Sequence, residues 1–401
     1  MSDENLNKKW KYEYFEIFAK NNEDKKELEQ ADKLKIEHFP PVIAKFYDDI
    51  NESELIKLCQ GKLVLKKGKL SNNNNQIVQI NYEKVLKVQL DNLMKQQIAK
   101  LEQEDPNFLK DDEKEIIDNS DFPFIKLMTL VYSKDTDEMT HEDQDKWKKY
   151  MNQFINQQII FGMVNNYYTM NLYQDNLYST TFQTPYNKKE VWEKYTDNNQ
   201  GLCLTYDFKE ITERNVKLLQ RIFPVIYSNG KLSCDDFDYK IYNPHCGLMS
   251  KPESNFIEFD NEWEYITHHK YTETEYKMLD TLLEPVYAKT MEYPPLKNII
   301  DSMYMIEENS EINYDFDGII ADVTELFNSS EFKELIHDSF EKVLEITEDS
   351  IEIDFMKPEA VYLGLNFPED KLDTYKKLTE EENVRIFKIN QKDDFLYKTL
   401  L

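Results

Sequence analysis

The segment 191–208, VWEKYTDNNQGLCLTYDF, constrains the fold of this chain more than any other. Trp192 and Tyr195 are three residues apart, so a short helix would place both rings on one face. Gly201 supplies the left-handed residue that commonly follows a helix. Alternating side chains at 202–207 then predict a half-buried strand. A helix-to-strand corner of this kind often forms one wall of a ligand pocket, and packing in a core explains the two rings equally well.

Short strands and helices alternate along the rest of the chain. Hydrophobic spacing predicts helices at 52–59, 83–104, 144–172, 209–221, 272–292, 323–346 and 370–382. Strands are predicted at 42–47, 61–66, 351–355, 360–364 and 384–390, and residues 176–230 read as strand, helix, strand, helix, strand. Residues 103–119 read as a charged linker, and 231–270 as an insertion or long loop because they show no period. This pattern predicts an α+β (mixed α/β) fold, a central mixed sheet with flanking helices.

The predicted domain organisation has two parts. Residues 1–40 form a helical N-terminal extension of two short helices, divided near Asn21–Asn22 and ended by the prolines after Phe39. Residues 41–401 form the α+β domain, with helical insertions at about 83–172 and 231–350.

Charge and composition limit the classes of partner. The chain has 77 acidic and 49 basic residues and a net charge of −28, which argues against a general nucleic-acid binder. No apolar run reaches the length of a membrane span, and the polar start MSDENLNKKW lacks a secretory signal. The four cysteines form no C-x-x-C pair and read as free thiols. We therefore expect a cytoplasmic protein without a membrane partner; the sequence leaves its oligomeric state open.

Five blocks of the sequence occur in an order typical of one family. They are ADKLKIEHFPPVIAKFYDD at 31–49, LYSTTFQ at 177–183, the segment 191–208, FPVIYSN at 223–229 and FMKPEAVYLGLNFPED at 355–370. In this order they resemble the bacterial domain-of-unknown-function family numbered 2971. Each block alone is weak, and the set of five makes the resemblance fairly specific.

This resemblance implies a remote likeness to ADP-ribosyltransferase-like folds. Such enzymes use a basic or polar residue on the first strand for the dinucleotide and a hydroxyl or aromatic residue on a middle strand. A late glutamate engages the nicotinamide ribose, and an aromatic ring stacks on the nicotinamide. The resemblance thus implies NAD as the cofactor. It assigns ligand binding to Lys45, Tyr47 (at a family arginine position), Thr181, Gln183, Trp192 and Tyr195.

The acidic block of that family, K-x-x-x-W-x-x-E-x-E-[YW]-R, fits this sequence in two registers. In one, Glu273 and Glu275 are the catalytic acids, although the preceding tryptophan is missing. In the other, Leu296 and Asn298 replace the glutamates, and the chain is an inactive relative. We favour Glu273 and Glu275. A pair of acids that stabilises a helix N-terminus explains these two residues at least as well.

Other candidate chemistry in the sequence is weaker. His268 and His269, with Glu262 and Glu264, contain metal-ligating residue types. Adjacent histidines on a strand point to opposite faces, however, so we predict no metal site there.

Two function classes follow. One is an ADP-ribosyltransferase-like enzyme or dinucleotide glycohydrolase, acting as a defence or toxin effector on a small-molecule nucleotide. The alternative is a non-catalytic module of the same fold that binds a ligand or a protein partner.

Overall fold

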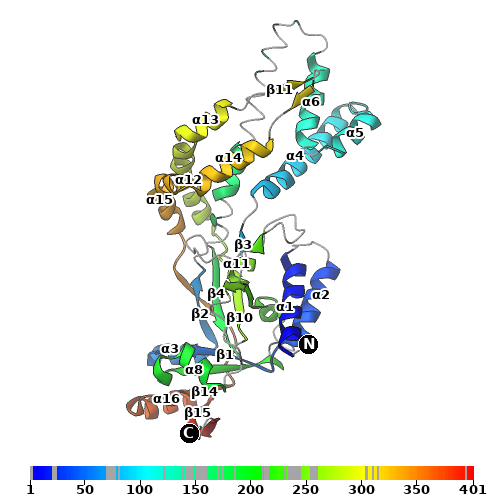
Figure 1. Ribbon diagram of the computed structural model, residues 1–401. Coiled ribbons are helices and arrows are strands. Elements are labelled where there is room, and N and C mark those ends of the chain that lie inside the picture. Colours follow the sequence, from blue (N-terminus) through cyan, green and yellow to red (C-terminus); the bar gives the residue numbers. More distant parts are fainter. Residues whose placement is uncertain are drawn as a thin grey trace.

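The computed structural model describes most of the chain. The described residues are 3–19, 25–68, 78–79, 82–120, 123–136, 140, 142, 146, 149, 160–168, 171–172, 176–184, 187–209, 211, 216–228, 232–233, 245–252, 261–302, 306–308, 311–313, 316–392 and 395–401. They form an α+β fold with two five-stranded sheets, an N-terminal helix pair and a helical lobe (Figure 1). The α+β prediction is confirmed. The central sheet predicted from the sequence is two sheets.

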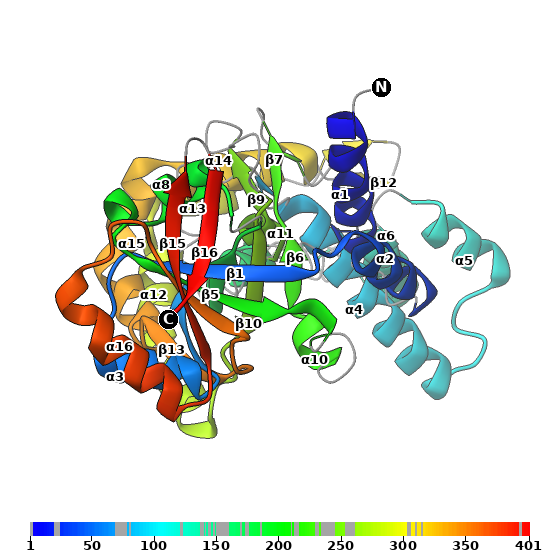
Figure 2. The same ribbon diagram turned by 90° about the horizontal axis from the view of Figure 1, so that it is seen from below.

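Sheet A is mixed. Its strand order is β1 (Val42–Tyr47), β5 (Leu202–Asp207), β14 (Ala360–Leu363), β15 (Arg385–Lys392) and β16 (Phe395–Leu400). Only the pair β14 and β15 is parallel among its described ladders. Helices α3 (Glu52–Cys59) and α16 (Glu369–Glu381) pack together beside this sheet, as the view from below shows (Figure 2). The sequence predicted all of these elements except β16.

Sheet B is antiparallel and runs up the middle of the molecule. Its order is β13 (Ser350–Asp354), β2 (Lys62–Lys67), β4 (Leu177–Phe182), β10 (Trp263–His268) and β6 (Ile222–Pro224). Strand β10 lies in the segment 231–270 that was predicted to be an insertion or loop, and for these residues that prediction is wrong. The side chains from Trp263 to Ile266 are buried on both faces of the strand, so the polar and apolar alternation of a half-buried strand is absent.

The two sheets join where β1 meets the end of β4. Ala44 and Gln183 exchange two backbone hydrogen bonds, of 3.0 and 2.7 Å, outside the regular ladders. Strand β1 therefore belongs to sheet A while its middle residues touch sheet B. Side chains from both sheets share one hydrophobic core, which includes Ile43, Phe182 and Tyr206.

The N-terminal extension is a pair of helices, α1 (Asp3–Ala19) and α2 (Lys25–His38). The pair packs beside sheet B (Figure 1). Lys35 of α2 is fully buried there and donates a 2.9 Å hydrogen bond to the carbonyl of Leu219, because a buried ammonium needs a partner. The same side of the molecule holds the parallel pair β7 (Ile226–Ser228) and β9 (Ser250–Pro252), and helix α11 (His245–Met249).

The helical lobe has a separate hydrophobic core. It contains α4 (Tyr82–Glu104), α5 (Asp111–Asp118), α6 (Pro123–Thr136), a helix at 160–168, α12 (Glu273–Glu292), α13 (Pro294–Ser302), α14 (Phe316–Asn328) and α15 (Ser330–Leu344). Two short hairpins or ladders complete the fold, β11 (Ile306–Glu308) with β12 (Glu311–Asn313) and β3 (Val78–Gln79) with β8 (Leu232–Ser233). Among the residues described above, no helix is long and apolar enough to cross a membrane.

Two predictions for this lobe are wrong. The charged linker at 103–119 contains helix α5, whose first turn is acidic and which buries Ile117. The single helix predicted at 323–346 is two helices, because the Ser329 side chain caps α15 by accepting a hydrogen bond from the backbone of Phe332. The predicted helix at 144–172 lies partly outside the described residues.

The predicted helix-to-strand corner is present as α8 (Lys189–Tyr195), the 3-10 turn Asp197–Asn199 and β5. The reason given for Gly201 is wrong, since the left-handed residues are Asn198 and Asn199, with φ of 48° and 59°. Gly201 is needed for close packing. A Cβ atom there would lie 2.1 Å from the carbonyl oxygen of Tyr47. A helix was also predicted at 209–221, and helix α10 (Val216–Leu219) lies within that range.

We expect Gly201→Ala to destabilise the protein by about 3 kcal/mol or more, because the new methyl group meets backbone atoms that cannot turn away. Chemical denaturation followed by circular dichroism measures the loss. Gly68→Ala is the control. Its Cβ would lie 3.1 Å from a Leu248 side-chain carbon and 3.2 Å from the carbonyl oxygen of Leu177, both much farther than 2.1 Å, so the loss should be smaller. Equal stability of Gly201→Ala and the unmodified protein would contradict the packing argument.

Candidate functional site

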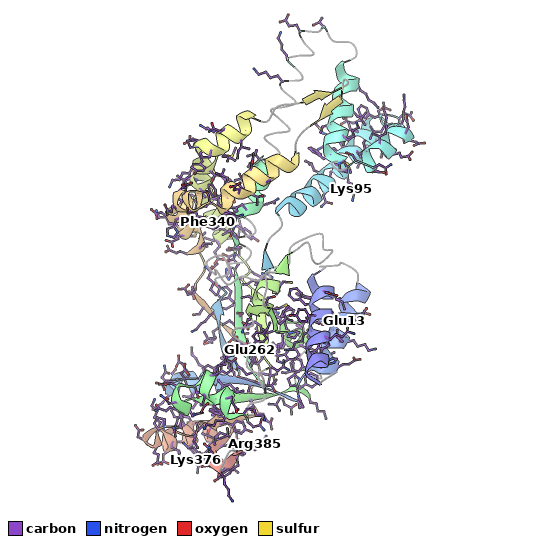
Figure 3. All side chains as sticks on the ribbon, in the orientation of Figure 1. Glu13, Lys95, Glu262, Phe340, Lys376 and Arg385 are labelled. Carbon is purple, nitrogen blue, oxygen red and sulfur yellow. The ribbon has the colours of Figure 1, made fainter. Side chains whose placement is uncertain are left out.

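Two glutamates lie buried on one face of β10. Glu262 immediately precedes the strand and Glu264 is its second residue, so both side chains point to the same side of sheet B. Their exposed fractions are 3% and 5%. Burial of two carboxylates is costly unless charged or hydrogen-bonding partners compensate them. Glu262 lies near the junction of the two sheets (Figure 3).

Glu262 has three partners, two from helix α8 and one from strand β9. The Tyr195 hydroxyl donates to Oε1, Lys194 lies 3.4 Å from the same oxygen, and Lys251 donates to Oε2. Burial alone raises the pKa of this carboxyl. The charge and hydrogen bond of Lys251, with the Tyr195 hydrogen bond, outweigh burial and hold the pKa of Glu262 below its usual range. Glu262 is therefore ionised at neutral pH.

Glu264 is held from two sides. Thr181 of the neighbouring strand β4 donates a 2.8 Å hydrogen bond from Oγ1 to Oε2 of Glu264. The ammonium of Lys251 lies 3.8 Å from the same oxygen, so this lysine bridges both carboxylates. The register of the ladder places Thr181 directly opposite Glu264, which explains the contact.

Lys45 of β1 completes the group. Burial lowers the pKa of its ammonium to about 8, and the charge of Glu264 partly opposes this shift. The nearby positive charges of Lys66 and Lys251 lower the same pKa further. Three lysines thus lie around two glutamates, and the local charge is positive in a chain whose net charge is −28. We call Lys45, Thr181, Lys194, Tyr195, Lys251, Glu262 and Glu264 the carboxylate cluster.

Gln183 lies at the edge of this cluster with an unused acceptor. Its neighbours Phe182 and Thr184 pair with Trp263 and Asn261, so Gln183 faces Glu262 across the ladder. The side chain is 3% exposed, and its Oε1 atom has no hydrogen-bond partner among the described residues. Buried acceptors are usually satisfied, so this atom fits a ligand that offers an N–H or O–H group.

The structure brings together four of the residues predicted to bind a ligand, namely Lys45, Thr181, Gln183 and Tyr195. Trp192 is not exposed to the cluster. It is 1% exposed and packs edge-on against Phe46, with ring centroids 5.0 Å apart. Tyr47 is half-buried at the end of β1, where burial raises the pKa of its hydroxyl. The ammonium of Lys45 lies 5.6 Å from the Tyr47 ring centroid.

Glu273 and Glu275 lie at the start of α12, beyond the opposite end of β10 from Glu262 (Figures 1 and 3). The Glu273 side chain is 86% exposed and pairs with Lys277. Glu275 forms a capping box with Thr272, whose backbone hydrogen bond lowers the pKa of the carboxyl. Helix capping accounts for Glu275, a first-turn position and an ion pair with Lys277 account for Glu273, and neither residue joins the carboxylate cluster.

The sequence contained a signal for the cluster that the two registers of the acidic block missed. Glu262-Trp263-Glu264-Tyr265 reproduces the E-x-E-[YW] part of that block. Phe259 stands at the tryptophan position and Ile266 at the arginine position, so the match is incomplete. The segment 231–270 was predicted to be an insertion or loop, so the sequence analysis did not place this third register of the acidic block on a strand.

No family model, curated protein or solved structure matches this chain. The family resemblance given above stays a prediction. Within the described part of the chain, no group of three or more His, Cys, Asp or Glu side chains is arranged to hold a metal ion. The cysteines in the described part of the chain, Cys59, Cys203 and Cys246, are buried thiols.

We expect Trp192→Ala to cost about 3–5 kcal/mol of folding free energy, because the ring fills a core position. A thermal melt measures the loss. Tyr195→Phe is the comparison, since it keeps the ring stacked on Phe46 and removes only the hydroxyl on Glu262. A Trp192→Ala protein that melts like the unmodified chain would show that the ring is not part of the core.

Proposed function

We propose that the carboxylate cluster binds a nicotinamide dinucleotide and cleaves its nicotinamide–ribose bond, as an ADP-ribosyltransferase-like enzyme or a dinucleotide glycohydrolase. The observation that carries this proposal is the pair of buried glutamates at the start of β10, with a β4 hydroxyl bonded to one of them and a β1 lysine near enough to interact electrostatically. These are the residue types and strand positions that the family resemblance implies. The unused Gln183 acceptor supports a ligand with hydrogen-bond donors.

The chain's residues divide into three roles. Glu264 places a carboxylate, oriented by Thr181, where positive charge on a ribose can be stabilised. Lys45 attracts the anionic diphosphate, and Gln183 accepts a hydrogen bond from the ligand. When the dinucleotide is bound, the bond from ribose C1 to nitrogen breaks, nicotinamide leaves with the electron pair, and water or an acceptor adds to C1 and releases a proton. Glu262 can accept that proton only if Lys251 shifts, because its oxygens already have partners.

One observation favours the alternative, a non-catalytic binding module. Lys251 and Lys194 offset the charge of the carboxylates, which reduces their ability to stabilise a cation. In this alternative the glutamates hold the sheets together, and the lysines bind an anionic ligand or an acidic protein segment. The enzyme reading explains Thr181 and Gln183 as well, and we therefore place it first. A defence or toxin effector would use this cleavage activity to deplete the dinucleotide.

We expect Glu264→Gln to lower the rate of nicotinamide release by about 100-fold or more, since an amide cannot stabilise developing positive charge. Release from the oxidised dinucleotide is measured chromatographically with purified protein. Glu262→Gln should lower the rate too, with a larger effect on transfer to an acceptor than on hydrolysis.

The matched control is the double variant Glu273→Gln/Glu275→Gln, which changes two carboxylates outside the cluster and should keep the rate. Loss of release in that variant, with Glu264→Gln active, would return the catalytic role to α12. No release together with dinucleotide binding by calorimetry would select the binding module. If the protein neither releases nicotinamide nor binds the dinucleotide, this ligand is excluded.

We expect dinucleotide affinity to fall by about tenfold between pH 7 and pH 9, because a lysine with a pKa of about 8 loses its charge in this window. Titration calorimetry at several pH values measures the change. Lys45→Arg stays charged throughout and should bind with little pH dependence. Lys45→Met should bind weakly at each pH. An equal fall in all three proteins would assign the titration to a group other than Lys45.

A further inference from the structure

Lys11 of α1 contacts two residues next to Glu262, namely Val225, between β6 and β7, and Asn261, which precedes Glu262 in the chain. Its ammonium donates a 3.1 Å hydrogen bond to the carbonyl of Val225 and a second hydrogen bond to Oδ1 of Asn261. The backbone N–H of Val225 in turn donates to the carbonyl of Glu262, at 3.0 Å, and Asn261 is the preceding residue. One side chain of the N-terminal helix therefore holds the backbone of Val225, which pairs with Glu262, and the side chain of the residue before Glu262.

Tyr12, the next residue, bonds to the strand that pairs with the strand of Lys251. Its hydroxyl donates a 2.7 Å hydrogen bond to the carbonyl of Tyr227 on β7. Tyr227 is in register with Lys251 on β9, the lysine that bridges Glu262 and Glu264. The position of β7 thus sets the point from which Lys251 reaches the carboxylates.

Trp10 packs against a side chain of strand β10. Its ring lies 6.0 Å from that of Trp263 and stacks on His38 at 4.5 Å. Trp263 lies between the two glutamates in sequence, so its side chain points to the opposite face of β10. Three consecutive residues of α1 therefore contact the strands that hold the carboxylate cluster.

We propose that α1 is a positioning element for this cluster, and that Lys11 and Tyr12 hold Glu262 and Lys251 in register with each other. This inference rests on the proposed function for its effect on turnover. Its geometric part, the effect on the Lys251 pair, stands without it. Helix α1 precedes residue 31, where the family resemblance begins, so the resemblance assigns α1 no role.

The test measures how fast Lys251 reacts with an amine-acylating ester, site by site, by mass spectrometry of the full chain. In the unmodified protein the Lys251 side chain is only 25% exposed and paired with a buried carboxylate, so acylation should be slow. We expect Lys11→Met and Tyr12→Phe each to raise the Lys251 rate by about threefold or more, a change equivalent to about 0.7 kcal/mol. Glu262→Gln is the positive control.

Two controls separate positioning from general loosening. Lys9→Met removes an exposed lysine from the same helix and should leave the Lys251 rate unchanged. Lys277, whose side chain is 74% exposed, is the internal reference in every protein. Lys11→Arg should restore slow acylation at Lys251. If turnover is present, Lys11→Met should lower kcat more than it changes KM.

An unchanged Lys251 rate in both Lys11→Met and Tyr12→Phe would overturn the inference. So would an equal rise at Lys251 in Lys9→Met. Failure of the proposed function gives a different result: the unmodified protein releases no nicotinamide, while the acylation rates at Lys251 still respond to Lys11 and Tyr12.

Discussion

The charge of Glu262 must be compensated inside the protein, and much of the structure around it follows from that requirement. A buried carboxylate without partners costs several kcal/mol, which is a large part of the stability of a typical domain. The compensating groups come from α8 and β9, which are distant in sequence from β10. Each of these elements must be in place before the acid can stay ionised and buried. Helix, strand and ladder are therefore coupled at this point.

The lysines of the cluster give the same site two opposed properties. They stabilise the carboxylates in the folded chain, and they reduce the negative potential that a cationic transition state would need. Lys251 is central because it reaches both acids. An anionic ligand group that drew this ammonium away would leave Glu262 and Glu264 more negative. Binding and activation would then be linked by a single side chain.

Much of the secondary structure follows from local sequence pattern. Strand β1, helix α3, strand β2 and helix α4 lie within a residue of their predicted limits, because each has a clear period or a capping residue. Strand β10 was missed, since a strand buried on both faces has no polar alternation, and this one also carries a buried acid. The four predicted ligand residues that meet at the cluster lie on or next to β1, β4 and α8, which are elements that the sequence predicted. Their acidic partners depended on the missed strand. The contact between β1 and β4 itself depends on long-range pairing, which no local pattern contains.

The strands of sheet B come from five widely separated parts of the chain, and the last of them, β13, begins at Ser350. Sheet A likewise lacks the neighbour of β5 until Ala360–Leu363 has been made. A growing polypeptide emerging from the ribosome therefore has its helical N-terminus and part of its lobe long before either sheet is closed. The junction that holds Lys45 near Glu264 needs β1, β4 and β10, so the carboxylate cluster cannot assemble during synthesis until β10 has been made.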